Sequence, residues 1–227
     1  MKSDRRRVLV IAAHPDDELL GCGGTIALHT RAGHEVTSVI ACEGESVRYG
    51  GDGTEQRAQG RNAAEVLGTK EVRWLTFRDQ RLDTLTLTDL IAPLEQAVRQ
   101  IQPHIVYCQH GGDINRDHKL LFEALLVATR PVESCIEAVY SFDTASSTEW
   151  AFPRTFVPDT WVDISSSLAL KLEAMAFYEK EVKDYPHPRS LKGLEHRAHA
   201  WGNQVCLDAA EAFMTVRRVI RWGAPLT

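Results

Sequence analysis

The 227-residue sequence predicts an α/β fold in which helices cover both faces of a doubly wound, mainly parallel sheet. Residues 7–13 are expected to form a strand, because Arg7 is followed by a continuous apolar run rich in β-branched side chains, which is typical of a strand buried on both faces. Residues 25–31 have helical spacing and end before Gly33, and residues 35–41 form a second strand. Strand, helix and strand at short intervals indicate a βαβ unit.

The same alternation continues to about residue 130. A glycine-rich loop at residues 44–54 leads into the next helix, and Pro103 stops a later one. The elements expected here are, in order, a helix ending near residue 68, a strand at 72–75, an amphipathic helix at 87–100, a strand at 105–108 and a helix at 118–129. Repeated alternation of this kind favours a parallel sheet with right-handed crossovers.

The regular alternation of strands and helices changes after Pro131. The elements expected in this part are strands at 138–142 and 161–164, a helix at 168–181 capped by one of the serines at 165–167, and a last helix from Leu191. We therefore expect one domain over residues 1–227. It comprises a Rossmann-like core at about 5–130 and a C-terminal segment at about 131–227 that completes the pocket.

Composition excludes several classes of function. The chain has 26 Lys and Arg against 31 Asp and Glu, a formal net charge of −5 and a pI near 6.0, which argues against nucleic acid as a partner. The longest apolar stretch, residues 8–13, is far too short to span a bilayer, and no secretory signal is visible. Five cysteines without CxxC spacing fit a reducing compartment. A cytoplasmic protein without membrane partners is expected.

Two polar clusters directly follow predicted strands. Residues 14–18, His-Pro-Asp-Asp-Glu, come after the first strand, and residues 110–118 come after the fourth. In a doubly wound sheet these two strands are usually neighbours where the strand order reverses, and ligands bind beyond their carboxyl ends. We expect the two loops to face one crevice.

The residue types in these loops suit a divalent cation. His14, Asp17 and His118 can supply the three protein ligands of a catalytic zinc, although Fe²⁺, Mn²⁺ and Co²⁺ accept the same donors. Asp16 is then left beside the metal, where its carboxylate can accept a proton from metal-bound water. Asp117 can accept the second ring N–H of a ligating imidazole.

A simpler interpretation is that the acidic loop only caps the following helix, since Asp is a favoured N-cap residue. Two such clusters at two strand ends are harder to explain by capping. Spacing alone therefore indicates a divalent-metal hydrolase of unspecified substrate.

Residues 13–18, Ala-His-Pro-Asp-Asp-Glu, resemble the signature of the PIG-L/LmbE-like N-deacetylases. Members of this family are zinc hydrolases that remove an acyl group, usually acetyl, from an amino sugar. The resemblance covers nearly the whole chain. Further stretches that fall in family order are residues 66–68, 79–83, 113–118, 186–190 and 210–213.

The resemblance implies zinc ligands at His14, Asp17 and His118 and a general base at Asp16. Two positions depart from the family pattern. Asn115 stands where several members have a histidine, and Asp113 stands where some members have an aromatic residue. The charge-stabilising role of that histidine and the carbonyl-polarising role of that aromatic residue are therefore open here.

Several residues are candidates for the remaining roles. The Asn115 amide can bond the developing oxyanion, and His187, held between two prolines, can protonate the leaving amine. Return of a proton from Asp16 is the simpler competitor to His187. The expected substrate-binding residues are Arg57, Arg61, Asp113 and Arg189, although a solvated helix face would also explain the first two.

The sequence thus predicts zinc-dependent hydrolysis of an N-acetyl group on an amino sugar or glycoconjugate, by a chain that can form a homo-oligomer. One alternative is a metal-containing sugar-binding module without catalysis, and another is a metallohydrolase of a different amide. A nucleotide-cofactor enzyme is disfavoured because the first turn lacks the GxGxxG pattern.

Overall fold

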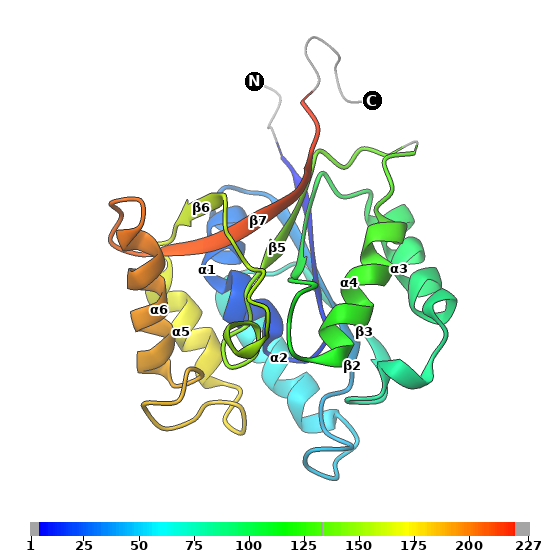
Figure 1. The fold of residues 1–227 in the computed structure, drawn as a ribbon, viewed down its shortest axis with the longest axis horizontal. Helices are drawn as coiled ribbons and strands as arrows, with labels where there is room; N and C mark the ends of the chain where they lie inside the picture. The colour runs from blue at the N-terminus through cyan, green and yellow to red at the C-terminus, as the bar shows by residue number, and fades with distance from the viewer. Residues whose placement is uncertain (1–4, 133, 221–227) are drawn as a thin grey trace.

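A seven-stranded sheet with strand order β3-β2-β1-β4-β5-β7-β6 lies between two layers of helices (Figure 1). The structure is a computed structural model that describes residues 5–132 and 134–220. Neighbouring strands from β3 to β5 pair in parallel, and β7 runs antiparallel to both β5 and β6. The predicted doubly wound, mainly parallel α/β sheet is confirmed.

The observed elements follow the predicted order. The strands are β1 (Arg7–Ala12), β2 (Glu35–Cys42), β3 (Glu71–Phe77), β4 (Ile105–Gln109), β5 (Ala138–Phe142), β6 (Thr160–Asp163) and β7 (Ala210–Arg218). The helices are α1 (Asp17–Arg31), α2 (Thr54–Leu67), α3 (Leu87–Ile101), α4 (Arg116–Ala128), α5 (Leu168–Ala176) and α6 (Leu191–Asn203). Two short 3₁₀ helices, η1 (Leu82–Thr84) and η2 (Thr148–Trp150), lie in the loops.

Side chains of β1 divide between two hydrophobic cores. Val8 and Val10 pack with residues of α1, α2 and α5, whereas Leu9 and Ile11 pack with residues of α3 and α4. All four side chains are fully buried. A strand covered on both faces needs apolar residues at every position, which explains the unbroken apolar run in the sequence.

Three elements differ from the sequence-based expectation. Helix α1 begins at Asp17 rather than near residue 25. Its first turns contain glycines, which weaken the helical signal in the sequence but are required by close packing against neighbouring side chains. A Cβ added to Gly21 would lie 2.0 Å from Cδ2 of Phe142. Helix α5 ends at Ala176, earlier than predicted. The C-terminal stretch forms strand β7, which inserts between β5 and β6.

A buried ion pair ties α1 to the C-terminal segment. Lys171 Nζ donates to Glu211 Oε1 (2.6 Å) and to the carbonyl oxygen of Leu20 (2.9 Å). Glu211 accepts hydrogen bonds from the backbone N–H groups of Gly24 and Thr25. These side chains therefore satisfy backbone groups in the middle of the helix whose N-terminus carries the Asp16-Asp17 pair.

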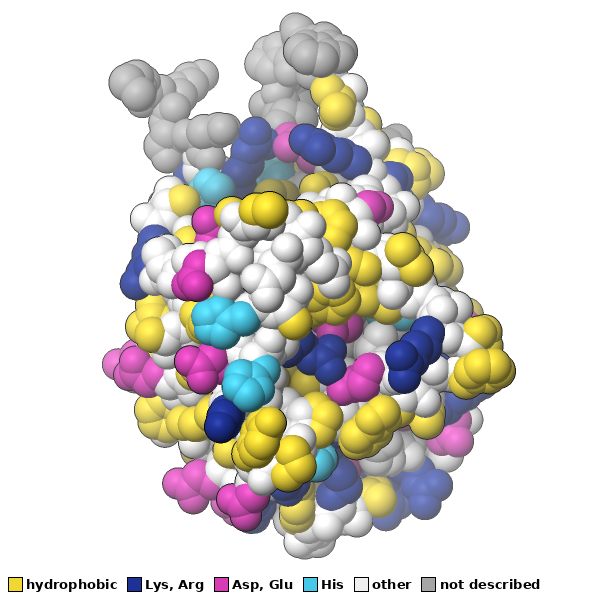
Figure 2. Space-filling view, turned by 60° about the vertical axis from the view of Figure 1, so that its left-hand side comes forward, with side chains coloured by type: hydrophobic (Ala, Val, Ile, Leu, Met, Phe, Trp, Pro, Cys, Tyr) yellow, Lys and Arg dark blue, Asp and Glu magenta, His cyan; other side chains and the backbone are white. Residues whose placement is uncertain are grey.

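One face of the molecule shows how charged and apolar side chains are distributed over the surface. On the face drawn in Figure 2, basic and acidic side chains are interspersed with apolar ones. Among the described residues, no helix combines the length and the apolar composition that a membrane crossing requires.

We predict that Lys171→Met destabilises the protein by about 3–5 kcal/mol, because it leaves the buried Glu211 carboxylate unpaired. The double variant Lys171→Met/Glu211→Gln should recover part of this loss, since the amide oxygen still accepts from the helix backbone. Urea unfolding of both variants measures the difference. Equal stability of the single variant and the wild-type protein would contradict this account.

Candidate metal centre

The pairing of β1 with β4 brings the two polar loops together. The two strands are parallel and adjacent, with Ile11 opposite Cys108. His14 lies in the loop after β1, Asp17 begins α1, and His118 lies in the first turn of α4. Two helix N-termini and two strand ends therefore converge at one point, as expected for the place where the strand order reverses.

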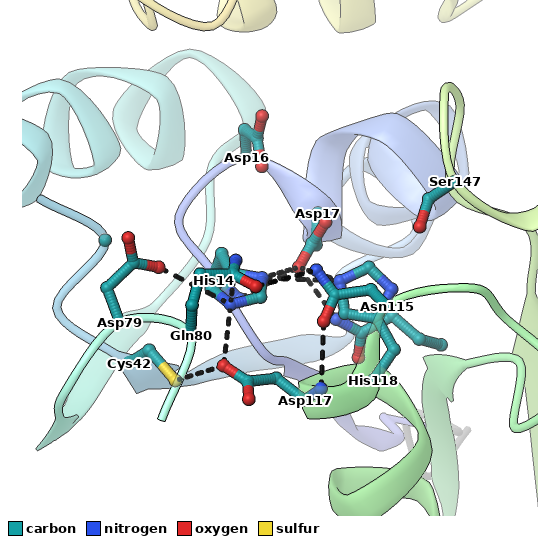
Figure 3. Close-up of polar contacts among 12 residues, drawn as sticks. His14, Asp16, Asp17, Cys42, Asp79, Gln80, Asn115, Asp117, His118 and Ser147 are labelled. Atoms are coloured by element: carbon teal, nitrogen blue, oxygen red, sulfur yellow. Dashed lines mark hydrogen bonds and ion pairs between the residues drawn. The ribbon is translucent and has the colours of Figure 1, made fainter. Parts of the chain in front are cut away.

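His14, Asp17 and His118 offer three ligand atoms that face one another (Figure 3). His14 Nδ1 lies 3.2 Å from Asp17 Oδ2 and 3.3 Å from His118 Nε2, and His118 Nε2 lies 3.3 Å from Asp17 Oδ2. All three side chains are buried. Two imidazoles and one carboxylate at this spacing form the donor set of a catalytic zinc site, so the residues present fit a divalent cation.

The electrostatics of the donor set also favour a bound cation. Burial opposes charge on Asp17, but the neighbouring imidazoles of His118 and His14 hold its pKa well below the usual range. Burial would lower the pKa of His118, but the carboxylates of Asp17 and Asp113 raise it to about 9. The pocket thus stabilises positive charge on its imidazoles, and a binding metal would displace those protons.

Two further carboxylates orient the imidazoles. Asp117 Oδ2 lies 3.1 Å from His14 Nε2, and Asp113 Oδ2 lies 3.3 Å from His118 Nδ1. The expected role of Asp113 in substrate binding is not supported, because its side chain is fully buried behind His118. There it accepts hydrogen bonds from Ser147 and Thr148.

A second group of potential ligands, His14, Cys42 and Asp117, shares its histidine with the first. Burial raises the pKa of the Cys42 thiol to about 11, which disfavours the thiolate that a metal needs. Neither Cys42 nor Asp117 lines the cavity at this site. The cavity is lined by His14, Asp16, Asp17, Arg48, Gln80, Asn115, His118, Thr144, Ser147 and Arg189. The His14, Asp17 and His118 set is therefore the better cation site.

Asp16 occupies a strained position beside the donor set. Its backbone has φ 102°, a left-handed conformation that is rare for a residue with a side chain. Glu18 supports this turn by accepting hydrogen bonds from the Asp16 N–H (3.2 Å) and from Tyr178 (3.0 Å). Burial raises the pKa of Asp16 well above its usual value, and the guanidinium of Arg189, 3.0 Å away, opposes that shift.

Asn115 lines the same cavity. Its Oδ1 accepts from the Asp117 N–H as the N-cap of α4, and its Nδ2 lies 3.4 Å from Gln80 Oε1. Gln80 Nε2 in turn lies 3.1 Å from His14 Nε2. The amide groups of Asn115 and Gln80 thus provide neutral polar groups on one wall.

Three predicted site residues lie elsewhere. Arg61 is exposed on α2, and Arg57, on the same helix, does not line the cavity. His187 also lies outside the lining. Its Nδ1 accepts from the backbone N–H of Arg189, and its ring packs edge-on against Trp150 with centroids 6.2 Å apart. Desolvation and the charge of Arg189 lower the pKa of His187, which disfavours it as a proton donor.

The structure adds cavity residues that the sequence analysis did not single out. They are Arg48, Gln80, Thr144 and Ser147. Arg48 lies in the glycine-rich loop after β2, and Thr144 and Ser147 lie in the loop after β5. Both loops follow the carboxyl ends of parallel strands, and this position is the feature of the sequence that could have identified these residues.

We predict that Asp117→Asn weakens metal affinity by roughly 10- to 100-fold, because the ligating His14 ring loses its charged partner. Competition with a chromophoric chelator measures this change. His196→Asn, which alters an exposed histidine, is the matched control and should bind metal like the wild-type protein. Equal affinities in both variants would argue against the role of Asp117.

Comparison with known proteins identifies the family of this chain. The PIG-L family, described as GlcNAc-PI de-N-acetylase, matches residues 9–129. An uncharacterized deacetylase of Escherichia coli, YaiS, is 32% identical over 67% of this chain and 81% of its own length. Diacetylchitobiose deacetylase of Thermococcus kodakarensis is 27% identical over 79% of this chain and 71% of its own length.

Solved structures share the fold. The conserved protein TT1542 of Thermus thermophilus has a TM-score of 0.79 and 22% identity, over 98% of this chain and all of that one. N,N'-diacetylchitobiose deacetylase of Pyrococcus horikoshii has a TM-score of 0.76 and 21% identity, over 94% of this chain and 84% of that one. The segment that matches the family, residues 9–129, contains His14, Asp17 and His118 and most of the β1–β4 pairing that joins them. The chain belongs to the PIG-L family.

Proposed function

We propose that this protein is a zinc-dependent N-deacetylase that hydrolyses the acetamido group of an amino sugar or glycoconjugate. The observation that carries the proposal is the placement of Asp16 at the cavity beside the His14, Asp17 and His118 donor set. Sequence relatives named as deacetylases support the reaction class. A relative from Rhodococcus erythropolis, 26% identical, is named as acting on an acetamido-glucopyranoside of inositol.

The reaction needs a water molecule to attack the acetyl carbonyl carbon, after which the carbon–nitrogen bond breaks and acetate and free amine leave. A divalent cation held by His14, Asp17 and His118 would polarise the carbonyl and lower the pKa of the water. The Asp16 carboxylate accepts the water proton and returns it to the departing nitrogen. Nδ2 of Asn115 is a donor to the oxygen that gains charge.

Substrate contacts come from the same cavity. Arg189 lines the cavity and donates from Nη1 to Asp16 and Glu181 and from Nε to Ser146, which leaves Nη2 as the donor for sugar oxygens. Its side chain retains 22% exposure, whereas that of Asp16 retains 2%. We assign Arg189 to substrate binding and place Arg57, Arg61 and Asp113 outside it.

A second reaction class occurs on this fold. GalB of Pseudomonas, a 4-carboxy-2-hydroxymuconate hydratase, has a TM-score of 0.74 and 23% identity over 97% of this chain. That likeness concerns the fold alone, so the reaction must be tested directly. Acetate release from N-acetylglucosamine, diacetylchitobiose and an N-acetylglucosaminide tests the proposal. Absence of acetate from every substrate with the zinc-loaded protein would reject it.

We predict that Asp16→Asn reduces kcat by roughly 10²- to 10⁴-fold, the usual contribution of a positioned acid–base group. Zinc content should stay at the wild-type level, because Asp16 is not one of the three ligands. Elemental analysis and acetate release measure the two effects. Asp208→Asn, at an exposed aspartate, is the control and should be fully active.

We predict that His187→Asn keeps kcat within about threefold of wild type, since a true general acid would contribute roughly 10² or more. The reason is that His187 lies outside the cavity and Asp16 can return the proton. Initial-rate measurements decide this point. A hundredfold loss with unchanged zinc content would restore His187 as the proton donor.

A further inference from the structure

A buried carboxylate outside the motifs of the sequence analysis lies behind the catalytic cavity. Glu181 follows α5, and its side chain is almost completely buried. Its Oε1 accepts from Gln56 Nε2 (2.9 Å) and the Tyr49 hydroxyl (3.1 Å). Its Oε2 accepts from Nη1 of Arg189 (2.7 Å) and of Arg48 (3.1 Å).

Arg189 connects this carboxylate directly to Asp16. The same Nη1 atom that donates to Glu181 also donates to Asp16 Oδ2 at 3.0 Å. Nε of Arg189 donates to Ser146 Oγ at 2.8 Å. The guanidinium is thus held at Nε by Ser146 and at Nη1, which is shared between Glu181 and Asp16.

Arg48 makes the equivalent connection on the other side. Its Nη1 donates to Glu181, and its Nε donates to Asp79 Oδ2 at 3.1 Å. Asp79 Oδ1 lies 3.6 Å from His14 Nε2. Opposite charges therefore alternate from Asp79 through Arg48, Glu181 and Arg189 to Asp16, with Glu181 at the centre.

We propose that Glu181 is a positioning residue for deacetylation: it holds Arg189 so that this side chain orients the Asp16 carboxylate toward the reacting centre. This inference rests on the proposed function, because it takes Asp16 as the general base. A planar guanidinium has donors at fixed angles, so an anion on one side determines where its other donors point. Glu181 itself does not line the cavity and acts through Arg189.

A merely structural role for Glu181 makes a different prediction. If Glu181 only neutralised two partly buried arginines, its loss would lower stability without a specific link to Arg189. If it positions Arg189, its loss and the loss of the guanidinium remove the same contribution to catalysis. Effects of residues that act as one unit are not additive, so a double-mutant cycle separates the two cases.

The cycle compares Glu181→Gln, Arg189→Lys and the double variant in the zinc-loaded full-length protein. We expect each single variant to lose roughly 10- to 100-fold in kcat, as a misplaced catalytic group does. KM should change much less than kcat in Glu181→Gln. The double variant should lose no more than Arg189→Lys alone. Multiplied losses in the double variant would overturn the inference.

Tyr49→Phe is the matched control, because it removes one hydrogen bond to Glu181 without altering either arginine. It should retain wild-type kcat. Melting temperature and zinc content are measured for every variant. Glu181→Asp, which keeps the buried charge but withdraws it from Arg189, replaces Glu181→Gln in the cycle if the latter does not fold.

Crystal structures of the variants provide a readout that needs no substrate. We expect Arg189 Nη1 to move away from Asp16 Oδ2 in Glu181→Gln and to stay in contact in Tyr49→Phe. A retained contact in Glu181→Gln would overturn the positioning role whatever the activity. If the wild-type protein releases no acetate, the proposed function fails, and the crystal structures still judge the positioning of Arg189.

Discussion

Parallel pairing of β1 with β4 is the constraint on which the site depends. It places the loop that carries His14 and Asp17 beside the N-terminus of α4, which carries His118. His118 is about one hundred positions from His14 and Asp17 in the sequence, yet the ligand atoms of the three residues lie 3.2–3.3 Å from one another. Because β1 packs against helices on both of its faces, a shift in register would disrupt the packing of both hydrophobic cores. Core packing therefore holds the ligands in place.

Burial of so many ionisable groups is costly, and the surrounding contacts offset that cost. Each imidazole of the donor set has a carboxylate beside its second nitrogen, Asp117 for His14 and Asp113 for His118. Asp17 Oδ2 also accepts from Gln109 Nε2 at 2.8 Å. A preorganised pocket of this kind presents its donor atoms without a large rearrangement, which would favour the binding of a divalent cation.

The C-terminal segment completes the cavity that the parallel core begins. Ser147 follows β5, and Arg189 precedes α6, so neither belongs to the first βαβ units. The ion pair of Lys171 with Glu211 attaches this segment to α1. A likeness of fold to both deacetylases and a hydratase indicates that the core supplies the frame, whereas reactivity depends on the side chains placed around it.

The sequence by itself determined the α/β class, the strand ends that carry polar loops and the donor types at His14, Asp17 and His118. These features are local, because strand burial and side-chain chemistry can be read from adjacent residues. It also predicted roles in the site for Asp113, Arg57, Arg61 and His187, whose positions depend on distant packing. The structure places these four side chains outside the lining of the cavity. Only the tertiary structure decided that Asp113 lies behind His118 and that Glu181 reaches Arg189, because contacts between remote segments have no periodic signal in the sequence.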